Sequence, residues 1–240
     1  MGSCSRATAR IGLKNSYGSS RLTAVMKVKV KAVIFDFGHV LTLPPRPENV
    51  AWLRERCGLD EEEYARAFDE LRPELDRGAM PLGEYWTLMA RRGGRRASSQ
   101  LLRTLGERDL GAWTLPNRAV FRWAEELRRG GWATAILSNM PPEFIPLLAE
   151  HFPEASRFSP AVFSCHVGMI KPEPGIFRHC LQLLGLAAAE TLFLDDMPVN
   201  VAAARGLGLH ALEFRSVEAS GRELAAGFQL PELVPAGVKG

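Results

Sequence analysis

The sequence predicts an α/β protein whose parallel sheet is flanked by helices and carries an inserted helical unit. Short apolar, β-branched runs alternate with amphipathic segments through the second half of the chain. Such alternation is typical of a parallel sheet with helices on both faces. Residues 44–110, by contrast, carry helical periodicity alone. The length of 240 residues allows one sheet core and one inserted subdomain.

The elements follow in order from these patterns. The run VKAVIFDF at residues 30–37 predicts a buried strand. Four helices are expected in the insertion, at 48–57, 60–72, 81–91 and 98–105, with breaks at Gly58, Pro73, Gly78 and Gly93-Gly94. Further strands are expected at 132–138, 161–165, 191–196 and 210–214, and further helices at 117–130, 141–150, 173–184, 198–206 and 217–227.

This order divides the chain into four parts. Residues 27–43 and 111–230 form the expected α/β core, and residues 44–110 form the helical insertion. Residues 231–240 are a tail that contains Pro and Gly. Residues 1–26 are rich in Ser, Gly, Ala and Arg and lack a sustained apolar period, which favours a disordered extension. A transit-type peptide is the alternative, because the stretch contains no acid.

Composition excludes several classes. Apolar residues make up 46% and charged residues 24%, which are globular values and not those of a disordered or coiled-coil chain. No apolar stretch approaches the roughly 18 residues of a membrane span, so no membrane partner is expected. The four cysteines show no CxxC or zinc spacing, which favours a reducing, cytoplasmic setting. A monomer or a homodimer is expected.

Charge argues against a nucleic-acid partner. The net charge is +3, but residues 1–35 hold seven basic side chains and no acid. The other 23 basic side chains face 27 acidic ones, which leaves the rest of the chain at −4. No basic stripe with interleaved aromatics occurs there.

Only six of the 30 basic residues are lysine, and Lys171 is the single lysine between Lys31 and Lys239. This isolation indicates a position that needs a compact ammonium.

Polar side chains follow the ends of the predicted strands. They are Asp36, the Ser138-Asn139 pair, the Asp195-Asp196 pair and, after the strand near 161–165, Lys171. Each alone has an ordinary interpretation as a helix cap, a turn or a solvated charge. Together they are expected to converge, because parallel sheets bind ligands at the carboxyl ends of their strands.

Such a group of residues suits phosphoryl transfer through an aspartyl intermediate. Asp36 can attack phosphorus only if its repulsion from the phosphate dianion is screened by a hard cation. Asp36, the Gly38 carbonyl, Asp195 and Asp196 supply suitable oxygen ligands. Lys171 would neutralise further charge, and Ser138 with nearby backbone N–H groups would hold the phosphoryl oxygens. Water would then hydrolyse the acyl phosphate.

At these residues the sequence resembles the haloacid dehalogenase superfamily of phosphohydrolases. The motifs occur in order, in IFDFGHVL, TAILSN, GMIKPEPGIF and TLFLDD, over roughly residues 30–215. The closest likeness is to glucose-1-phosphatase-like enzymes and to the N-terminal phosphatase domain of soluble epoxide hydrolases. The resemblance implies a Rossmann-like parallel sheet of order 3-2-1-4-5, and it implies that residues 44–110 are a helical cap.

The resemblance also implies a role for each motif residue. Asp36 would be the nucleophile and a Mg²⁺ ligand, and Asp196 the principal further ligand, with Asp195 assisting. Ser138 and Asn139 would bind the phosphoryl group, and Lys171 would stabilise it and orient Asp36. Asn200 would support the metal ligands from behind. The substrate implied is a small phosphorylated metabolite, with a sugar phosphate favoured.

One position departs from the family pattern. Most phosphatases of this superfamily carry a second Asp two residues after the nucleophile as general acid and base, and Gly38 stands there in this chain. A good leaving group would suffer least from this loss. Water or His39 could substitute, although a structural role is expected for His39, with a substrate-binding role as the alternative.

Three other functions compete with the phosphatase interpretation. A non-catalytic phosphate-binding module is favoured by Gly38 alone. A hydrolytic dehalogenase would not need the paired acids at 195 and 196, and a phosphomutase would normally use the missing acid–base residue.

Within the cap, the turn around Gly78 is expected to reach the site. Five aromatic residues are expected mainly in the cap core: Trp52, Tyr64, Phe68, Tyr85 and Trp86.

Overall fold

A five-stranded, all-parallel sheet forms the centre of the protein, and its strand order is β3-β2-β1-β4-β5. The computed structural model describes residues 27–235. The strands are β1 (Ala32–Phe35), β2 (Ala133–Ser138), β3 (Ala161–Phe163), β4 (Thr191–Asp195) and β5 (His210–Glu213). The expected fold class and strand order are therefore confirmed.

Helices cover both faces of the sheet, and alternate strand residues pack against each layer. Val33 and Phe35 of β1 belong to one apolar cluster, which includes residues of α5 (Arg118–Arg129), α6 (Ile145–His151) and α10 (Val217–Gly227). Ile34 belongs to the opposite cluster with α8 (Pro174–Leu184) and α9 (Pro198–Gly206). Because strand side chains alternate between faces, the fully buried run AVIF serves both layers.

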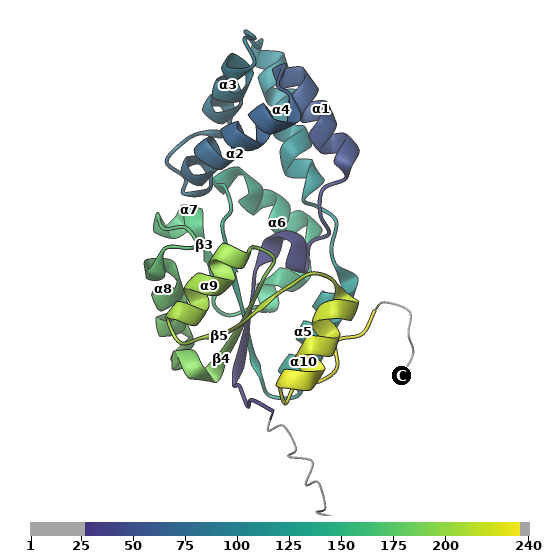
Figure 1. Cartoon of the computed structure of the whole chain (residues 1–240), viewed down its shortest axis with the longest axis vertical. Helices are drawn as coiled ribbons and strands as arrows, with labels where there is room; N and C mark the ends of the chain where they lie inside the picture. The colour runs from purple at the N-terminus through teal and green to yellow at the C-terminus, as the bar shows by residue number, and fades with distance from the viewer. Residues whose placement is uncertain (1–26, 236–240) are drawn as a thin grey trace, which may run out of the picture.

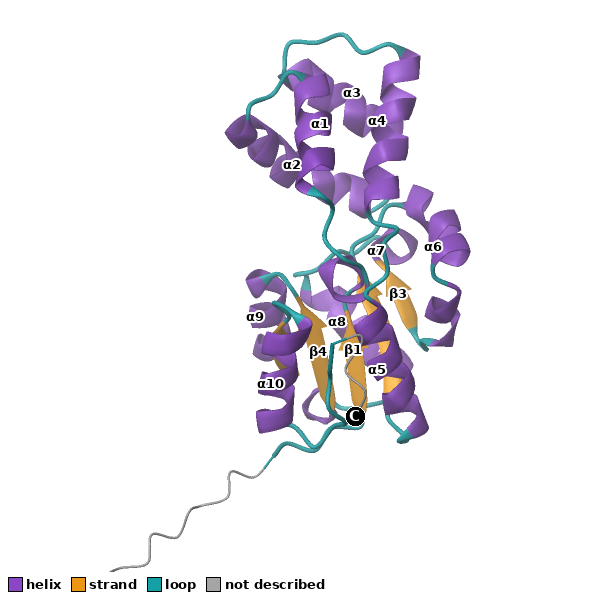
Figure 2. Ribbon diagram, turned by 90° about the vertical axis from the view of Figure 1, so that its right-hand side faces the viewer, coloured by secondary structure: helices purple, strands orange, loops and turns teal. Residues whose placement is uncertain are grey.

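Four further helices stand beyond the carboxyl ends of the strands, at the top of Figure 1. They are α1 (Pro47–Cys57), α2 (Glu61–Asp76), α3 (Leu82–Arg92) and α4 (Ser99–Ala112). An apolar cluster of their own holds them together, with Tyr85, Trp86 and Met89 fully buried at its centre. Figure 2 shows this helical unit separate from the orange strands and joined to the core near α7 (Ser164–Val167).

Helix α2 corrects one prediction. Pro73 was expected to end this helix at residue 72, but the helix continues through Pro73 to Asp76. A proline inside a helix removes one backbone hydrogen bond. Leu75, which is fully buried, and Asp76, which pairs with Arg72 one turn earlier, hold the last turn in place. The start of α2 is set by a capping box between Asp60 and Glu63.

Other boundaries differ by a few residues. The strand expected at 161–165 ends at Phe163 and is followed directly by α7. The helix expected at 98–105 extends to Ala112, so the expected cap boundary at residue 110 falls inside α4. The helix expected at 141–150 is a 3-10 turn over Pro142–Phe144 followed by α6. A tight turn over Phe37–Leu41 and a 3-10 turn over Pro153–Arg157 were not expected.

The N-terminal extension expected at 1–26 lies outside the described residues, as do the last residues of the expected tail, 236–240. None of the helices within residues 27–235 combines the length and apolar character that crossing a membrane requires.

Candidate active site

The register of the three central strands places two carboxylates side by side. Phe35 of β1 is paired with Leu194 of β4, so the next residues, Asp36 and Asp195, are neighbours. The backbone N–H of Asp36 continues the ladder by donating to the carbonyl of Leu194 at 2.8 Å. On the other side of β1, Phe35 is paired with Ile136, two residues before Ser138.

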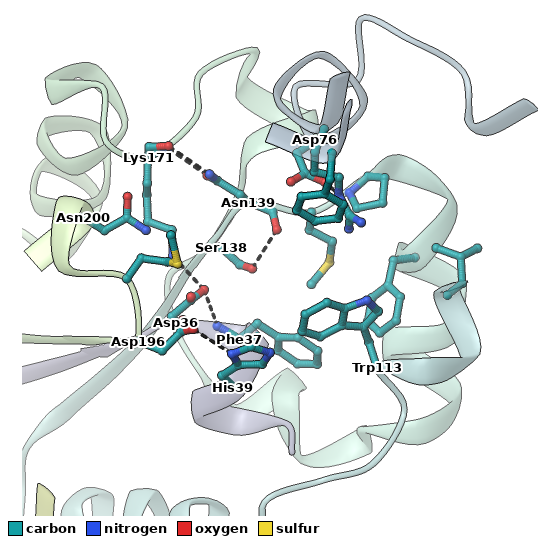
Figure 3. Close-up of a pocket in the computed structure, with 18 residues that line it drawn as sticks. Asp36, Phe37, His39, Asp76, Trp113, Ser138, Asn139, Lys171, Asp196 and Asn200 are labelled. Atoms are coloured by element: carbon teal, nitrogen blue, oxygen red, sulfur yellow. Dashed lines mark hydrogen bonds and ion pairs between the residues drawn. The ribbon is translucent and has the colours of Figure 1, made fainter. Parts of the chain in front are cut away.

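Lys171 joins these carboxylates. Its Nζ lies 2.7 Å from Oδ1 of Asp36 and 2.6 Å from Oδ2 of Asp195, and only 2% of its side chain is exposed. Asn139 fixes the backbone of Lys171 from both sides: Nδ2 of Asn139 donates to the Lys171 carbonyl, and the Lys171 N–H donates to Oδ1 of Asn139. The amide of Asn139, expected to bind the phosphoryl group, is therefore engaged in positioning Lys171 (Figure 3).

The adjacent acids at the end of β4 have different environments. Asp195 is fully buried, and it accepts hydrogen bonds from the Met197 N–H and from Nδ2 of Asn200, besides its pair with Lys171. Asp196 is partly exposed, lines the central cavity and contacts Nδ1 of His39 at 2.7 Å. Asn200 thus supports Asp195, and Asp196 presents the more accessible oxygens.

These carboxylates fit a hard cation. One oxygen from each of Asp36, Asp195 and Asp196 can be chosen so that all lie within 4.8 Å of one another. Three carboxylates face the one ammonium of Lys171 here, so negative charge is in excess. Carboxylate oxygens are the ligands that Mg²⁺ prefers. The residues present therefore fit the ion that the sequence led us to expect.

Burial and charge shift the titration of this cluster. The pKa of Asp36 is raised to about 7: burial is the largest cause, Lys171 opposes the shift, and Asp195 and Asp196 also raise the value. Burial alone would lower the pKa of Lys171, but Asp195 and Asp36 outweigh it and hold the pKa above its usual value, so the ammonium stays charged. A cation beside Asp36 would favour its ionised form.

Ser138 is the last residue of β2, and its buried hydroxyl lines the cavity, 3.3 Å from the carbonyl of Asn139. Asp36, Gly38, His39, Asn139, Lys171, Asp196 and Asn200 line the same cavity. Asp195 lies behind it. The structure therefore brings together all the residues that the sequence singled out, eight of them facing the cavity.

The cavity, of about 310 Å³, also takes residues that the sequence did not single out as a site. Helix α2 contributes Arg72 and Asp76, and α4 is followed by Trp113. Phe68 of α2 also lines the cavity, whereas Tyr85 and Trp86 are buried in the apolar cluster of the helical unit, as expected. Phe68, Arg72 and Asp76 are spaced four residues apart, so a helix that reached residue 76 would have placed them on one face. This spacing is the sequence feature that could have identified them as cavity residues.

The turn around Gly78 was expected to reach the site. Asp76 at its start lines the cavity, but Arg77 and Gly78 do not, and they contact the core instead. Both terminal nitrogens of Arg77 bind the carboxylate of Glu173, at 2.7 and 3.2 Å, and one also donates to the carbonyl of Gly168 at 3.1 Å. Arg77 is thus a polar link between the helical unit and the core.

Comparison with known proteins agrees with this geometry. The family model for a haloacid dehalogenase-like hydrolase matches residues 30–208. The chain belongs to the haloacid dehalogenase-like hydrolase family. It is thus a hydrolase by family, as the motifs at Asp36, Ser138, Lys171 and Asp195-Asp196 led us to expect.

Three curated relatives of this hydrolase differ in length and in the share of their chains that matches. Acyl-CoA dehydrogenase family member 10 of Mus musculus is 28% identical over 85% of this chain and 20% of its own length. Bifunctional epoxide hydrolase 2 of Rattus norvegicus is 28% identical over 85% of this chain and 40% of its own length. Sesquiterpene phosphatase astK of Aspergillus oryzae is 29% identical over 81% of this chain and 94% of its own length. The chain thus spans less than half of the first two relatives.

Solved structures show the same fold. A predicted HAD-like family hydrolase from Porphyromonas gingivalis superimposes with a TM-score of 0.65 and 26% identity, over 82% of this chain and 98% of that one. A HAD family enzyme from Bacteroides thetaiotaomicron, in complex with magnesium and inorganic phosphate, has a TM-score of 0.60 and 22% identity, over 77% and 93% of the two chains.

This haloacid dehalogenase-like hydrolase departs from its family pattern at Gly38, and the structure gives a reason. A β-carbon at Gly38 would lie 3.3 Å from the ring of Trp113, which is tighter than ordinary van der Waals contact. The same ring stacks on His39, with 5.2 Å between centroids. His39 has a positive φ of 56°, and the hydrogen bond that its Nδ1 donates to Asp196 raises its pKa. Trp113 therefore occupies the space beside Gly38, and Asp196 and Trp113 fix His39.

Proposed function

We propose that the protein is a Mg²⁺-dependent phosphohydrolase that cleaves a small phosphorylated metabolite through an aspartyl phosphate on Asp36. The observation that carries this proposal is the buried contact of Asp36 and Asp195 with Lys171, beside the more accessible Asp196 and the hydroxyl of Ser138. Support also comes from the printed names of its relatives, which include a sesquiterpene phosphatase and phosphoglycolate phosphatases.

Asp36 acts as the nucleophile in this proposal. Its Oδ1 is held by Lys171 at 2.7 Å and by the Phe37 N–H at 2.6 Å, which leaves Oδ2 for attack. The attack forms a bond from Oδ2 to phosphorus and breaks the bond to the leaving oxygen, which takes a proton. Water then adds to phosphorus, the bond to Asp36 breaks, and inorganic phosphate leaves.

The other residues bind and orient. Asp36, Asp196, the Gly38 carbonyl and, directly or through water, Asp195 would hold Mg²⁺, which when bound neutralises the charge between nucleophile and phosphate. Lys171 and the Ser138 hydroxyl neutralise and bind the phosphoryl oxygens as charge develops on them. Asn139 and Asn200 keep Lys171 and Asp195 in place.

We assign residues 44–110 as a cap that covers the leaving group, with the α/β core in 27–43 and 111–230. The separate apolar cluster of α1–α4 and the cavity-lining residues of α2 support this division. The sugar phosphate favoured by the sequence stays a prediction, as do the monomeric or homodimeric state and the cytoplasmic setting.

The test is phosphate release from a panel of sugar, nucleotide, lipid, aryl and acyl phosphates, with and without Mg²⁺. We expect Mg²⁺-dependent turnover that is lost in Asp36→Asn, which keeps the shape of the side chain and removes the nucleophile. Binding of a phosphate mimic without release from any compound would favour the alternative, a phosphate-binding module. Halide release from a haloacid would favour the dehalogenase instead.

A further inference from the structure

The wall of the cavity that faces the leaving group is built by the cap. If the phosphoryl group lies between Asp36, Ser138 and Lys171, the alcohol to which it is esterified must extend toward α2 and α4. This wall is lined by Phe68, Arg72 and Asp76 of α2, by Leu110 of α4 and by Trp113, which follows α4. Figure 3 shows Asp76 across the pocket from Asp36 and Asp196. Arg72 is the one basic side chain among these five.

Arg72 already faces two carboxylates, although its Nη1 has no hydrogen-bond partner among the described residues. Its Nε donates to Oδ1 of Asp76 at 2.7 Å, and its Nη1 lies 3.6 Å from Oδ2 of Asp109 on α4. Its side chain is 13% exposed and that of Asp109 is 9% exposed, so both are held inside the cap. One guanidinium thus faces two carboxylates, and even if one of these keeps its proton, the group carries no net positive charge.

Contacts within α2 and with the core fix the positions of Arg72 and Asp76. Arg72 and Asp76 are one helical turn apart on α2, which places them on the same face. The backbone carbonyl of Asp76 accepts a hydrogen bond from the Ser164 hydroxyl of the core, at 2.5 Å. Asp76 is therefore anchored where the cap meets the core, and its carboxylate stays in the wall of the cavity.

The rest of the wall is apolar. Phe68, Leu110, Trp113, Met140, Phe144 and Met197 line the same cavity. A sugar ring placed among these side chains could bond only to Arg72 and Asp76, so its other hydroxyls would lose water without gaining partners, which costs binding free energy. An aromatic or aliphatic group would lose little and would bury its own surface.

We propose that this site selects phosphate monoesters of uncharged, largely apolar alcohols, and that the Arg72–Asp76–Asp109 group rejects a leaving group that carries a second anion. The inference rests on the proposed phosphatase function and narrows its substrate class. A free Arg72 would instead have favoured substrates with a carboxylate or a second phosphate, because guanidinium pairs readily with both.

Matched substrates test the proposal on the wild-type protein. Phenyl phosphate and 4-carboxyphenyl phosphate differ by one carboxylate, and the carboxylated phenol is the slightly better leaving group. A charge repelled across a partly buried cavity should still lower kcat/KM for the carboxylated ester by about tenfold or more. Glucose 1-phosphate should also be used about tenfold less well than phenyl phosphate.

Asp76→Asn gives the second arm. It removes one negative charge and keeps the shape, so we expect the preference for phenyl phosphate over its carboxylated form to fall several-fold. Asp69→Asn is the matched control, because Asp69 is exposed on the same helix and does not line the cavity. That variant should keep the wild-type preference.

Three results would overturn the inference. The wild-type protein could use the two aryl esters equally well, it could use glucose 1-phosphate as well as phenyl phosphate, or Asp76→Asn could keep the wild-type preference between the aryl esters. Each is distinct from a failure of the proposed function, in which no ester is hydrolysed at all. The wild-type comparison decides the matter even if Asp76→Asn does not fold.

Discussion

Trp113 and Gly38 form a pair that accounts for the missing acid–base residue. A side chain at position 38 would press against the Trp113 ring, because even a β-carbon would lie 3.3 Å from it. The ring would have to move by a few tenths of an ångström, and it is held by its stack on His39. The absence of a carboxylate at position 38 is therefore linked to the packing of Trp113, which lies 75 positions later in the chain.

A double variant tests this link. Gly38→Asp alone should gain no activity, because its side chain meets Trp113. Gly38→Asp combined with Trp113→Leu should raise kcat for a poor leaving group by roughly tenfold or more, since a placed general acid contributes about 10²–10⁴. Steady-state kinetics with an alkyl phosphate measures both, and Trp113→Leu alone is the control. An equal gain in the single Gly38→Asp variant would refute the steric explanation.

The titration of Asp36 predicts how Mg²⁺ affinity depends on pH. Burial raises its pKa to about 7 in the metal-free protein, and the metal needs the ionised carboxylate. Affinity should therefore rise with pH up to about 7 and then level off, with a proton released on binding below that pH. Protonated His39 competes for Asp196 in the same direction.

Calorimetric titration of Mg²⁺ in buffers of different ionisation enthalpy measures this proton release. In Asp36→Asn the affinity should be lower and its pH dependence weaker. An Mg²⁺ affinity that falls as pH rises from 5 to 7 would contradict the assignment of Asp36 as a ligand.

Side chains next to strand ends were predictable from sequence, and those that depend on packing between units were not. Asp36, Ser138 and Asp195 follow buried runs whose parallel register brings them together. Asp76 reaches the cavity because α2 continues past Pro73, and no local pattern indicates that continuation. The contact of Trp113 with Gly38 depends on how the cap meets the core.

At the scale of elements, one ion pair links the end of α2 to the core, beside the hydrogen bond that the Ser164 hydroxyl donates to the Asp76 carbonyl. Arg77, directly after α2, binds Glu173 with two nitrogens and the carbonyl of Gly168 with one of them. The pair is partly exposed, so it contributes about 0–1 kcal/mol to the free energy of unfolding. Its larger effect should be on where the cap rests over the cavity.

Arg77→Met should therefore raise KM several-fold and leave the free energy of unfolding within about 1 kcal/mol of wild type. Arg92→Met is the matched control, because Arg92 pairs with Glu70 inside the cap and not with the core. Urea unfolding and steady-state kinetics on both variants supply the comparison. The same change of KM in both would show that the link to the core has no special role.

The strands and most helices could be predicted because each is a short apolar or amphipathic run with clear breaks. The exceptions are elements whose ends depend on tertiary contacts. β3 stops at Phe163, and the next residues form α7, in which the buried Ser164 hydroxyl reaches Asp76 of the cap. Helix α4 extends past residue 105 because Leu110 and Ala112 are buried.

At the scale of the whole molecule, the two units divide the chemistry between them. The α/β core supplies the carboxylates from the ends of β1 and β4, Ser138 from the end of β2 and Lys171 from the loop before α8, whereas the helical unit supplies the cavity-lining residues of α2 and α4. Motifs in the core carry the family pattern, whereas the cap carries weak motifs. Reaction type could therefore be predicted from the sequence more readily than substrate class.

The most direct test of this account is to trap the covalent intermediate. The protein would be mixed with Mg²⁺ and an aryl phosphate, quenched in acid during turnover, digested and mapped by mass spectrometry. We predict one hydroxylamine-labile phosphoryl group on the peptide that contains Asp36, dependent on Mg²⁺ and absent in Asp36→Asn. Because Gly38 supplies no base for the second step, this species should accumulate. Turnover with no label, or with the label on another residue, would contradict the account.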